Sequence, residues 1–231
     1  MKQRRVMLKL SGEALAEHSS YDDEKIRSIA RQVKTETDKG TQVGIVIGGG
    51  NYWRGRSAGD MDRTKADQIG MLATVLNCIY VSERFREEGM KTVIMTPFIC
   101  GSMTELFSKD KAVGYFESGH VIFFAGGTGH PFFSTDTGLV LKAAELDADM
   151  VLLAKSIDGI YNADPAKHPD AVRYDKVSID EVIAKNLQAI DMTASVLARD
   201  NKIPLTVFDM NEEGSIAAAL AGTVRGTVVT V

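Results

Sequence analysis

Short apolar stretches recur along the chain, and most of them end at glycine. The clearest is the stretch VGIVI at residues 43–47, which is followed directly by Gly48, Gly49 and Gly50. Branched apolar residues bounded by glycine are typical of a buried strand. Similar stretches predict further strands at residues 5–10, 91–95, 121–125, 150–154, 205–208 and 227–231.

Between these strands, apolar residues recur at helical spacing. They predict a helix from Asp22 or Asp23 to about residue 39, and a long helix over residues 64–88. The apolar positions of the long helix fit either the core or an interface between subunits. Further helices are predicted within residues 104–117, 136–146, 178–186, 193–201 and 215–220. Residues 155–176 show no regular pattern and are predicted to form loops; a short β-hairpin within them is an alternative.

The alternation of strands and helices predicts the fold class. It favours a mainly parallel central sheet covered by helices on both faces, a three-layer α/β/α sandwich. The chain has 231 residues and no linker rich in proline or glycine, so a single domain over residues 1–231 is the simplest interpretation. The alternative is that the loops after Lys155 form a loosely separate lobe.

Composition narrows the functional classes. A hydrophobic fraction of 44% and a charged fraction of 25% are ordinary for a globular protein, and the net charge of −4 argues against a general nucleic-acid-binding surface. The two cysteines and four histidines lack zinc-ligand spacing. No apolar run approaches a membrane span or a signal peptide. We therefore expect a cytoplasmic protein that binds neither nucleic acid nor membranes.

Glycines, hydroxyl-bearing residues and charged residues follow four of the predicted strands. In open α/β sheets, ligands bind beyond the carboxyl ends of the strands. Those ends carry residues 9–12 (KLSG), 48–50 (GGG), 126–129 (GGTG) and 155–159 (KSIDG). Glycine lets backbone approach a ligand closely, and helix starts favour phosphate. Together these segments predict a polyphosphate site with room for two anionic ligands. Lys9, at the end of a buried strand, is placed to neutralise a transferring phosphoryl group.

Two common phosphate motifs do not explain the glycines. Residues 50–57, GNYWRGRS, match the Walker pattern except that Arg56 replaces its lysine, and no acidic strand end downstream suits Mg²⁺. The dinucleotide pattern G-x-G-x-x-G fails because Trp53 occupies its last position. The glycine-rich turn therefore belongs to some other class of phosphate site.

Several longer motifs resemble the amino-acid-kinase superfamily. They are KLSGEAL at residues 9–15, VIGGGN at 46–51, GTGHPFFSTDT at 127–137, DGIYNADP at 158–165 and LARDNKIPLTVFDMN at 197–211. Within it, GMLATV at 70–75 and the PFFSTD stretch resemble the bacterial uridylate (UMP) kinases. The similarity covers essentially the whole chain. It implies transfer of the γ-phosphate of ATP to UMP, giving ADP and UDP in pyrimidine nucleotide synthesis, with Mg²⁺ accompanying ATP.

The resemblance also implies roles for individual residues. Lys9 and Asp136 would be catalytic, with Asp136 organising the lysine and the metal, and no residue is assigned as a dedicated metal ligand. The implied ATP-binding residues are Lys9, Leu10, Ser11, Gly12, Gly50, Arg54, Lys155, Tyr161 and Asp164. The implied UMP-binding residues are Gly49, Asp67, Thr128, Gly129, His130, Pro131, Phe132, Phe133, Ser134 and Thr135.

Simpler interpretations of some of these residues stay open. Arg54 fits a solvated loop, Asp164 fits a plain turn before proline, and Asp136 fits ordinary complementarity to a helix dipole. Adjacent aromatic residues such as Phe132 and Phe133 are usually core. Lys155 adds a second positive charge near the phosphates, which is a hypothesis.

One segment departs from the family. Many bacterial UMP kinases carry a glycine-rich stretch after GEAL that forms part of an allosteric GTP site, whereas residues 16–23 read AEHSSYDD. This departure argues against activation by GTP. The resemblance further implies a homohexamer and UTP as a feedback inhibitor. Two other functions remain: a superfamily member that phosphorylates a carboxylate or carbamate, and a nucleotide-sensing protein without catalysis.

Overall fold

The computed structural model describes residues 3–17, 20–53, 59–187 and 189–231. Its helices are α1 (Asp23–Thr37), α2 (Arg63–Glu87), α3 (Lys109–Glu117), α4 (Thr135–Glu145), α5 (Ile179–Ala184), α6 (Met192–Asp200) and α7 (Ser215–Ala221). The longer strands are β1 (Arg5–Leu10), β4 (Gln42–Ile47), β5 (Lys91–Thr96), β7 (His120–Phe124), β8 (Met150–Lys155), β12 (Leu205–Asp209) and β13 (Thr227–Thr230). The shorter ones are β2 (Ala16–Glu17), β3 (Ser20–Tyr21), β6 (Glu105–Leu106), β9 (Ile160–Tyr161), β10 (Arg173–Tyr174) and β11 (Lys176–Ser178).

One large sheet forms the centre of the molecule. Among the described residues it has nine strands in the order β11-β13-β12-β8-β1-β4-β7-β5-β6. All neighbouring pairs are parallel except β12 with β13. The strands whose ends carry the predicted phosphate-binding segments are β8, β1, β4 and β7, and they lie side by side in the middle of the sheet.

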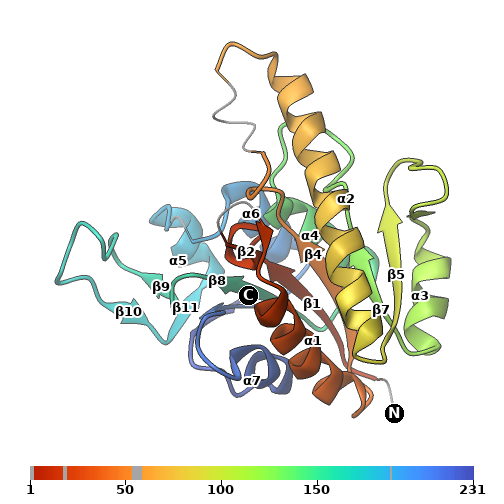
Figure 1. Ribbon diagram of the computed structural model, residues 1–231. Coiled ribbons are helices and arrows are strands. Elements are labelled where there is room, and N and C mark those ends of the chain that lie inside the picture. Colours follow the sequence, from red (N-terminus) through yellow and green to blue (C-terminus); the bar gives the residue numbers. More distant parts are fainter. Residues whose placement is uncertain (1–2, 18–19, 54–58, 188) are drawn as a thin grey trace.

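Helices cover both faces of the sheet, as Figure 1 shows. On one face α1, α2 and α7 pack on residues such as Val6, Leu8 and Leu10 of β1. On the other face α3, α4, α5 and α6 pack on Met7 of β1 and its neighbours. Because successive strand residues point to opposite faces, Lys9 shares the α4 side with Met7. The predicted three-layer α/β/α fold is confirmed.

Most predicted elements agree with the structure to within a few residues at their ends. Asp22 caps α1 and Ser134 caps α4, because their side chains accept the N–H of Lys25 and Thr137. The optional hairpin within residues 155–176 exists as the antiparallel pair of β9 and β10. The helix predicted within residues 104–117 is α3, which begins at Lys109, and the short strand β6 precedes it. The strands β2, β3 and β11 have only two or three residues each, too few for a periodic pattern.

The long helix α2 has two apolar faces. The residues at helical spacing that marked it in the sequence include Ile69, Leu72, Leu76 and Ile79, and all four are exposed. A different face, with Val75, Cys78, Val81 and Phe85, packs on the sheet. We call the four exposed residues the α2 stripe. Their exposure rejects the interpretation that they belong to the core of this chain.

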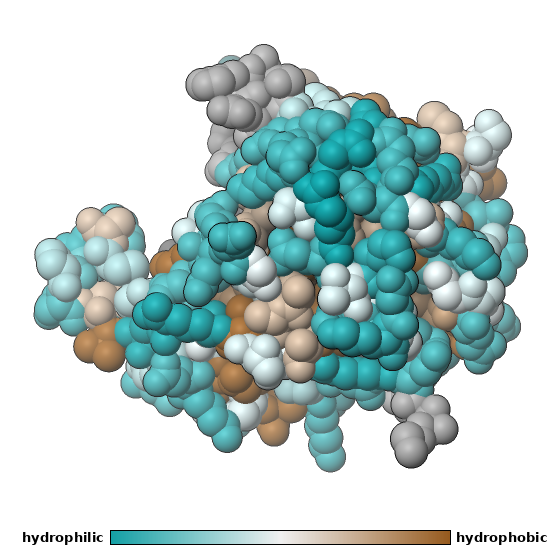
Figure 2. All heavy atoms as spheres, turned by 60° about the horizontal axis from the view of Figure 1, so that its bottom comes forward, coloured by the Kyte–Doolittle hydropathy of each residue, from teal (hydrophilic) through white to brown (hydrophobic). Residues whose placement is uncertain are grey.

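Other surfaces of the molecule are more polar. Figure 2 views the lower side of Figure 1, where hydrophilic residues predominate and apolar ones form small separate patches. Within the described part of the chain, no helix combines the length and the hydropathy needed to cross a membrane.

Candidate active site

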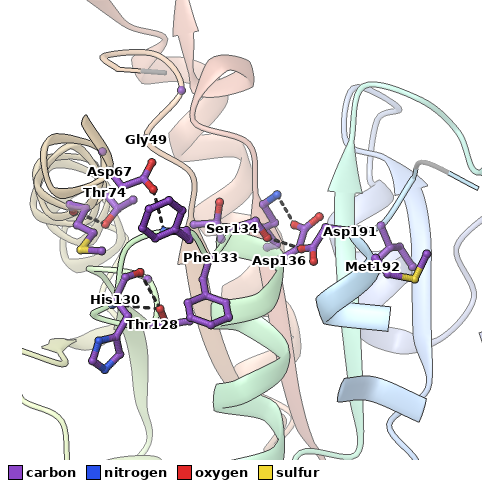
Figure 3. A pocket seen from close by; sticks show the side chains of 18 of the residues that line it. Gly49, Asp67, Thr74, Thr128, His130, Phe133, Ser134, Asp136, Asp191 and Met192 are labelled. Carbon is purple, nitrogen blue, oxygen red and sulfur yellow. Dashed lines mark hydrogen bonds and ion pairs between the residues drawn. The ribbon is translucent and has the colours of Figure 1, made fainter. Parts of the chain in front are cut away.

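Four neighbouring strands end at one pocket. The central strands β8, β1, β4 and β7 are adjacent and parallel, so their carboxyl ends meet at one edge of the sheet. A pocket of about 780 Å³ opens there. Figure 3 shows Asp67 and Thr74 on one side of it, Asp191 and Met192 on the opposite side, and Ser134 and Asp136 between them. The convergence of strand ends that the sequence predicts is thus present.

At the floor of the pocket, two lysines share one carboxylate. Lys9 at the end of β1 donates to Oδ1 of Asp136, and Lys155 at the end of β8 donates to Oδ2 with a distance of 3.2 Å. Asp136 is the second residue of α4, and it is buried. Two ammonium groups around one carboxylate leave one positive charge, next to the free N–H groups of a helix start. This arrangement favours an anion.

The ionisation of this cluster follows from its burial and its neighbours. Burial by itself raises the pKa of Asp136, but Lys9 and Lys155 outweigh it, so the pKa lies below its ordinary value of 3.8. Burial lowers the pKa of Lys155 below its ordinary value of 10.5; Asp136 opposes that shift and Lys9 adds to it. Asp136 is therefore an anion at neutral pH, and it holds the two cations in place.

A second carboxylate joins two helix starts above this cluster. Asp191 caps α6 by accepting the N–H of Ala194 at 2.9 Å. The same carboxylate accepts the hydroxyl of Ser134, which caps α4, and the hydroxyl of Thr137 at 3.2 Å. The N-termini of α4 and α6 are thereby fixed together at the pocket.

The glycine-rich turn after β4 packs tightly against the turn after β1 and against helix α2. A Cβ atom at Gly12 would lie 2.1 Å from the carbonyl oxygen of Gly48, and one at Gly49 would lie 2.8 Å from the carbonyl oxygen of Gly70. A Cβ at Gly50 would lie 2.5 Å from a carboxylate oxygen of Glu13. Close approach of a ligand was the reason given for these glycines from the sequence. The structure adds a second reason at Gly49, where a side chain would collide with the backbone of α2, and at Gly50, where the Glu13 side chain would have to move.

This packing predicts a stability difference between two glycine substitutions. Gly12→Ala is expected to lower the free energy of unfolding by about 1–3 kcal/mol, because the new methyl group displaces the Gly48 carbonyl. Gly114→Ala, inside α3 with no atom within 4 Å, is the matched control and is expected to raise it by about 0.5–1 kcal/mol. Urea unfolding measures both. Equal stability of the two variants would contradict the tight contact between the turns.

One wall of the pocket is held by an ion pair. Arg63 donates to both oxygens of Asp67 at 2.9 Å, and Asp67 also accepts the backbone N–H of Phe132 at 2.8 Å. The Arg63 guanidinium lies 5.4 Å from the centre of the Phe132 ring, a cation–π contact. Phe132 has φ 71°, which is uncommon outside glycine. Asp67 thus connects α2 to the loop before α4.

The chain is similar to known proteins over most of its length. The sequence model described as the Amino acid kinase family matches residues 4–209. The chain belongs to the amino acid kinase family. Similar solved structures include a UMP kinase from Bacillus anthracis, 34% identical, covering 98% of this chain and 96% of that chain with a TM-score of 0.93. A UMP kinase from Ureaplasma parvum is 33% identical, covers 100% of both chains and has a TM-score of 0.95.

A more distant structure has the same fold. The uridylate kinase from Archaeoglobus fulgidus is 25% identical and has a TM-score of 0.73, with 97% of this chain and 99% of that chain covered. The resemblance stated from the sequence motifs is confirmed. As a member of a kinase family, the chain is an enzyme of phosphoryl transfer.

The predicted site residues divide into two groups in this kinase. Those that line the pocket are Lys9, Gly49, Gly50, Asp67, Thr128, His130, Phe132, Phe133, Ser134, Thr135, Asp136 and Lys155. Those that do not line it are Leu10, Ser11, Gly12, Gly129, Pro131, Tyr161 and Asp164. Arg54 lies outside the described residues. The core interpretation of the two phenylalanines is wrong, since Phe132 is 67% and Phe133 51% exposed.

The second group has visible structural roles. The side chain of Leu10 is fully buried in the core. Asp164 accepts the N–H of Ala166 at 3.0 Å, which is the turn that was the simpler interpretation of this residue. Tyr161 donates to Asp158 at 2.7 Å in the β9–β10 hairpin, which projects from the left side of the molecule in Figure 1. Any contact of Tyr161 or Asp164 with a nucleotide stays a prediction.

Some pocket residues were not identified from the sequence. They include Trp53, Arg63, Thr74, Asp191 and Met192. Two of these residues have a local sequence pattern that could have pointed to them. Arg63 lies four residues before Asp67, the spacing of a helical ion pair, and Asp191 precedes a helix as a cap does. Thr74 accepts the N–H of Gly126 at 2.7 Å, a contact across 52 positions that no local pattern reveals.

Proposed function

We propose that this kinase transfers the γ-phosphate of ATP to UMP and releases ADP and UDP. The observation that carries this proposal is the cluster of Lys9, Asp136 and Lys155 in a pocket whose lining presents two kinds of chemistry. The wall of Asp67 and the loop before α4 suits a nucleoside with ribose hydroxyls. The glycine turn and the helix starts suit phosphates. The full-length similarity to two UMP kinases supports this choice of acceptor.

The chemical step requires little covalent participation by the protein. An oxygen of the UMP phosphate forms a bond to the γ-phosphorus of ATP, while the bond from that phosphorus to the bridging β,γ-oxygen breaks and its electron pair leaves with ADP. Negative charge shifts to the oxygens around the transferring group. Lys9 and Lys155 converge on that region, and their cations stabilise the shifted charge. Asp136 does not touch the reacting phosphorus in this scheme; it orients both lysines.

Mg²⁺ is expected to accompany ATP. Both oxygens of Asp136 are engaged by lysines, and both oxygens of Asp191 by Ser134, Thr137 and Ala194. In the described part of the chain, no cluster of three or more carboxylate, histidine or cysteine side chains could hold a metal. This donor set fits an ion that would be held mainly by phosphate oxygens and water, with Asp136 as the carboxylate that would orient it. When bound, Mg²⁺ neutralises phosphate charge.

A panel of acceptors tests the proposal. ADP formation with Mg²⁺ and ATP is measured against UMP, dUMP, CMP, AMP and carboxylate acceptors, with and without UTP or GTP. We expect turnover with UMP, inhibition by UTP and no activation by GTP. Turnover of a carboxylate without turnover of UMP would assign the chain to the other branch of its family. Binding of ATP and UMP without any UDP would instead indicate a sensor.

Asp67 provides a test of acceptor recognition. A carboxylate can accept two hydroxyl hydrogen bonds, so Asp67→Asn is expected to raise the KM for UMP by about 10- to 100-fold with a smaller change in kcat. Its effect should be weaker with dUMP, which lacks one hydroxyl. Glu83→Gln, an exposed carboxylate farther along α2, is the matched control. An equal rise in KM for UMP and dUMP would mean that Asp67 acts only on the loop of Phe132.

Three wider features belong to the same proposal. We propose that residues 1–231 act as one catalytic domain, that the enzyme works in the cytoplasm in pyrimidine nucleotide synthesis, and that copies of it associate into a homohexamer. The α2 stripe supports association, since four exposed apolar residues along one helix face are a common feature of subunit interfaces. A monomer in sedimentation velocity experiments would contradict it.

A further inference from the structure

Outside the pocket, the buried side-chain amide of Asn77 binds both ends of the glycine-rich turn, Gly48 and Asn51. Asn77, on α2, has no exposed surface. Its Nδ2 donates to the carbonyl oxygen of Gly48 at 2.7 Å and to Oδ1 of Asn51 at 2.8 Å. Its Oδ1 accepts Nδ2 of Asn51 at 3.0 Å. A buried amide that makes this many hydrogen bonds holds its partners at defined positions.

The partners of Asn77 enclose the part of the turn that lines the pocket. Gly48 and Asn51 flank Gly49 and Gly50, and both of these glycines line the pocket. Without side chains, a segment of this kind has more backbone freedom than any other. Asn77 thus holds the two ends of a flexible segment to the helix α2.

A tyrosine adds a further hydrogen bond to this amide. The hydroxyl of Tyr21 donates to Oδ1 of Asn77 at 2.8 Å. The Tyr21 ring stacks on Tyr80, with 3.8 Å between ring centres. Burial raises the pKa of Tyr21 well above its usual range, so the hydroxyl keeps its proton and remains a donor. Because the Gly48 carbonyl can only accept, Nδ2 of Asn77 faces it, and Oδ1 is left to accept the Tyr21 hydroxyl.

We propose that Asn77 is a positioning residue for phosphoryl transfer: by clamping Gly48 and Asn51 it sets the Gly49–Gly50 backbone between donor and acceptor phosphates. This rests on the proposed function. Asn77 touches no substrate itself. The clamp matters because a transferring group loses rate when the surrounding backbone is displaced by a fraction of an ångström to an ångström.

Kinetics and hydrogen exchange test the clamp together. Asn77→Ala is expected to lower kcat by about 10- to 100-fold at a temperature below the unfolding of every variant. It should also speed amide exchange at residues 48–52 of the free protein. Tyr21→Phe, which keeps the ring stacking, is expected to lower kcat by roughly 2- to 10-fold. The matched control is Ser82→Ala, a buried hydrogen-bonded residue of the same helix outside the pocket, which should lower Tm but not kcat.

A conservative variant separates positioning from mere stability. In Asn77→Asp the new carboxyl group cannot donate to Gly48 when ionised, but it can when protonated. The ratio of its kcat to that of the wild type should therefore rise as the pH falls from 8 to 6, since burial raises the pKa of a carboxyl group. A residue that only stabilises the fold would leave this ratio unchanged.

Two results would overturn the proposal. One is an Asn77→Ala variant that keeps kcat within twofold of the wild type. The other is exchange at residues 48–52 that is no faster than in Ser82→Ala. If the wild-type protein does not phosphorylate UMP, the proposed function fails instead. The clamp is then judged by exchange and by the Kd for Mg-ATP, and an unchanged Kd in Asn77→Ala overturns it.

Discussion

Replacing Lys9 with alanine is expected to lower kcat by about 10³-fold while the protein stays folded. The Lys9 ammonium lies beside Asp136 at the junction of the phosphate-binding elements, where negative charge shifts during transfer. Removing one preorganised stabiliser of such charge has an effect of this size. Stability should change less, by about 1–3 kcal/mol, because Lys155 still pairs with the buried carboxylate. Initial rates at saturating ATP and UMP give kcat, and urea unfolding gives the stability.

Two further variants sharpen this test. Lys9→Met keeps most of the apolar stem and removes only the charge, so its kcat should fall as far as that of Lys9→Ala. Lys142→Met is the matched control: Lys142 is likewise an ion-paired lysine with little exposed surface, bound to Glu145 at 2.5 Å, but it lies outside the pocket. It should lose stability and keep kcat. A Lys9→Met enzyme with most of its turnover would remove Lys9 from the mechanism.

The fold could be predicted from local patterns, because its strands and helices are marked locally. Residues 43–47 are apolar and are followed by three glycines, and Ser134 caps α4 where a polar segment becomes periodic. The rule that ligands bind at the carboxyl ends of parallel strands then places Lys9 and Lys155 together. The pairing of β1 with β8 brings the two lysines side by side. The link of Lys9 to Asp136, which is on α4 and not on a strand, was implied by the family resemblance and not by strand order.

The rest of the site depends on contacts between distant segments. Phe132 and Phe133 were predicted by resemblance to face UMP, while their residue type favours the core. The structure exposes both, and the left-handed backbone of Phe132 is bound by Asp67, which is far away in the sequence. The α2 stripe has the same pattern as a buried face, so periodicity alone cannot distinguish an exposed stripe from a core. Asn77 in LNC resembles any polar residue of a helix until its bonds to Gly48 and Asn51 are seen.

Asp136→Asn is expected to lower kcat by about 10²- to 10³-fold and to destabilise the fold by about 3–5 kcal/mol near neutral pH. The carboxylate holds Lys9 and Lys155 together, and removing it leaves two partly buried cations close to each other without the negative charge between them. The control is Asp110→Asn, since Asp110 has the same position in α3 that Asp136 has in α4, but is exposed and outside the pocket. If Asp136 served only to complement a helix dipole, both variants would lose about 0.3–1 kcal/mol and keep turnover.

The difference in free energy of unfolding between the wild type and Asp136→Asn should depend on pH with a definite sign. Because the pKa of Asp136 is lower in the folded protein than its ordinary value of 3.8, the wild type gains stability from it above that value. This gain is lost as the pH falls through the lower pKa of the folded state. Urea unfolding from pH 7 down to the acid limit of the protein should show the gap between wild type and Asp136→Asn constant above about pH 5 and shrinking below about pH 4. A gap that widens in acid would mean that the two lysines do not hold the carboxylate ionised.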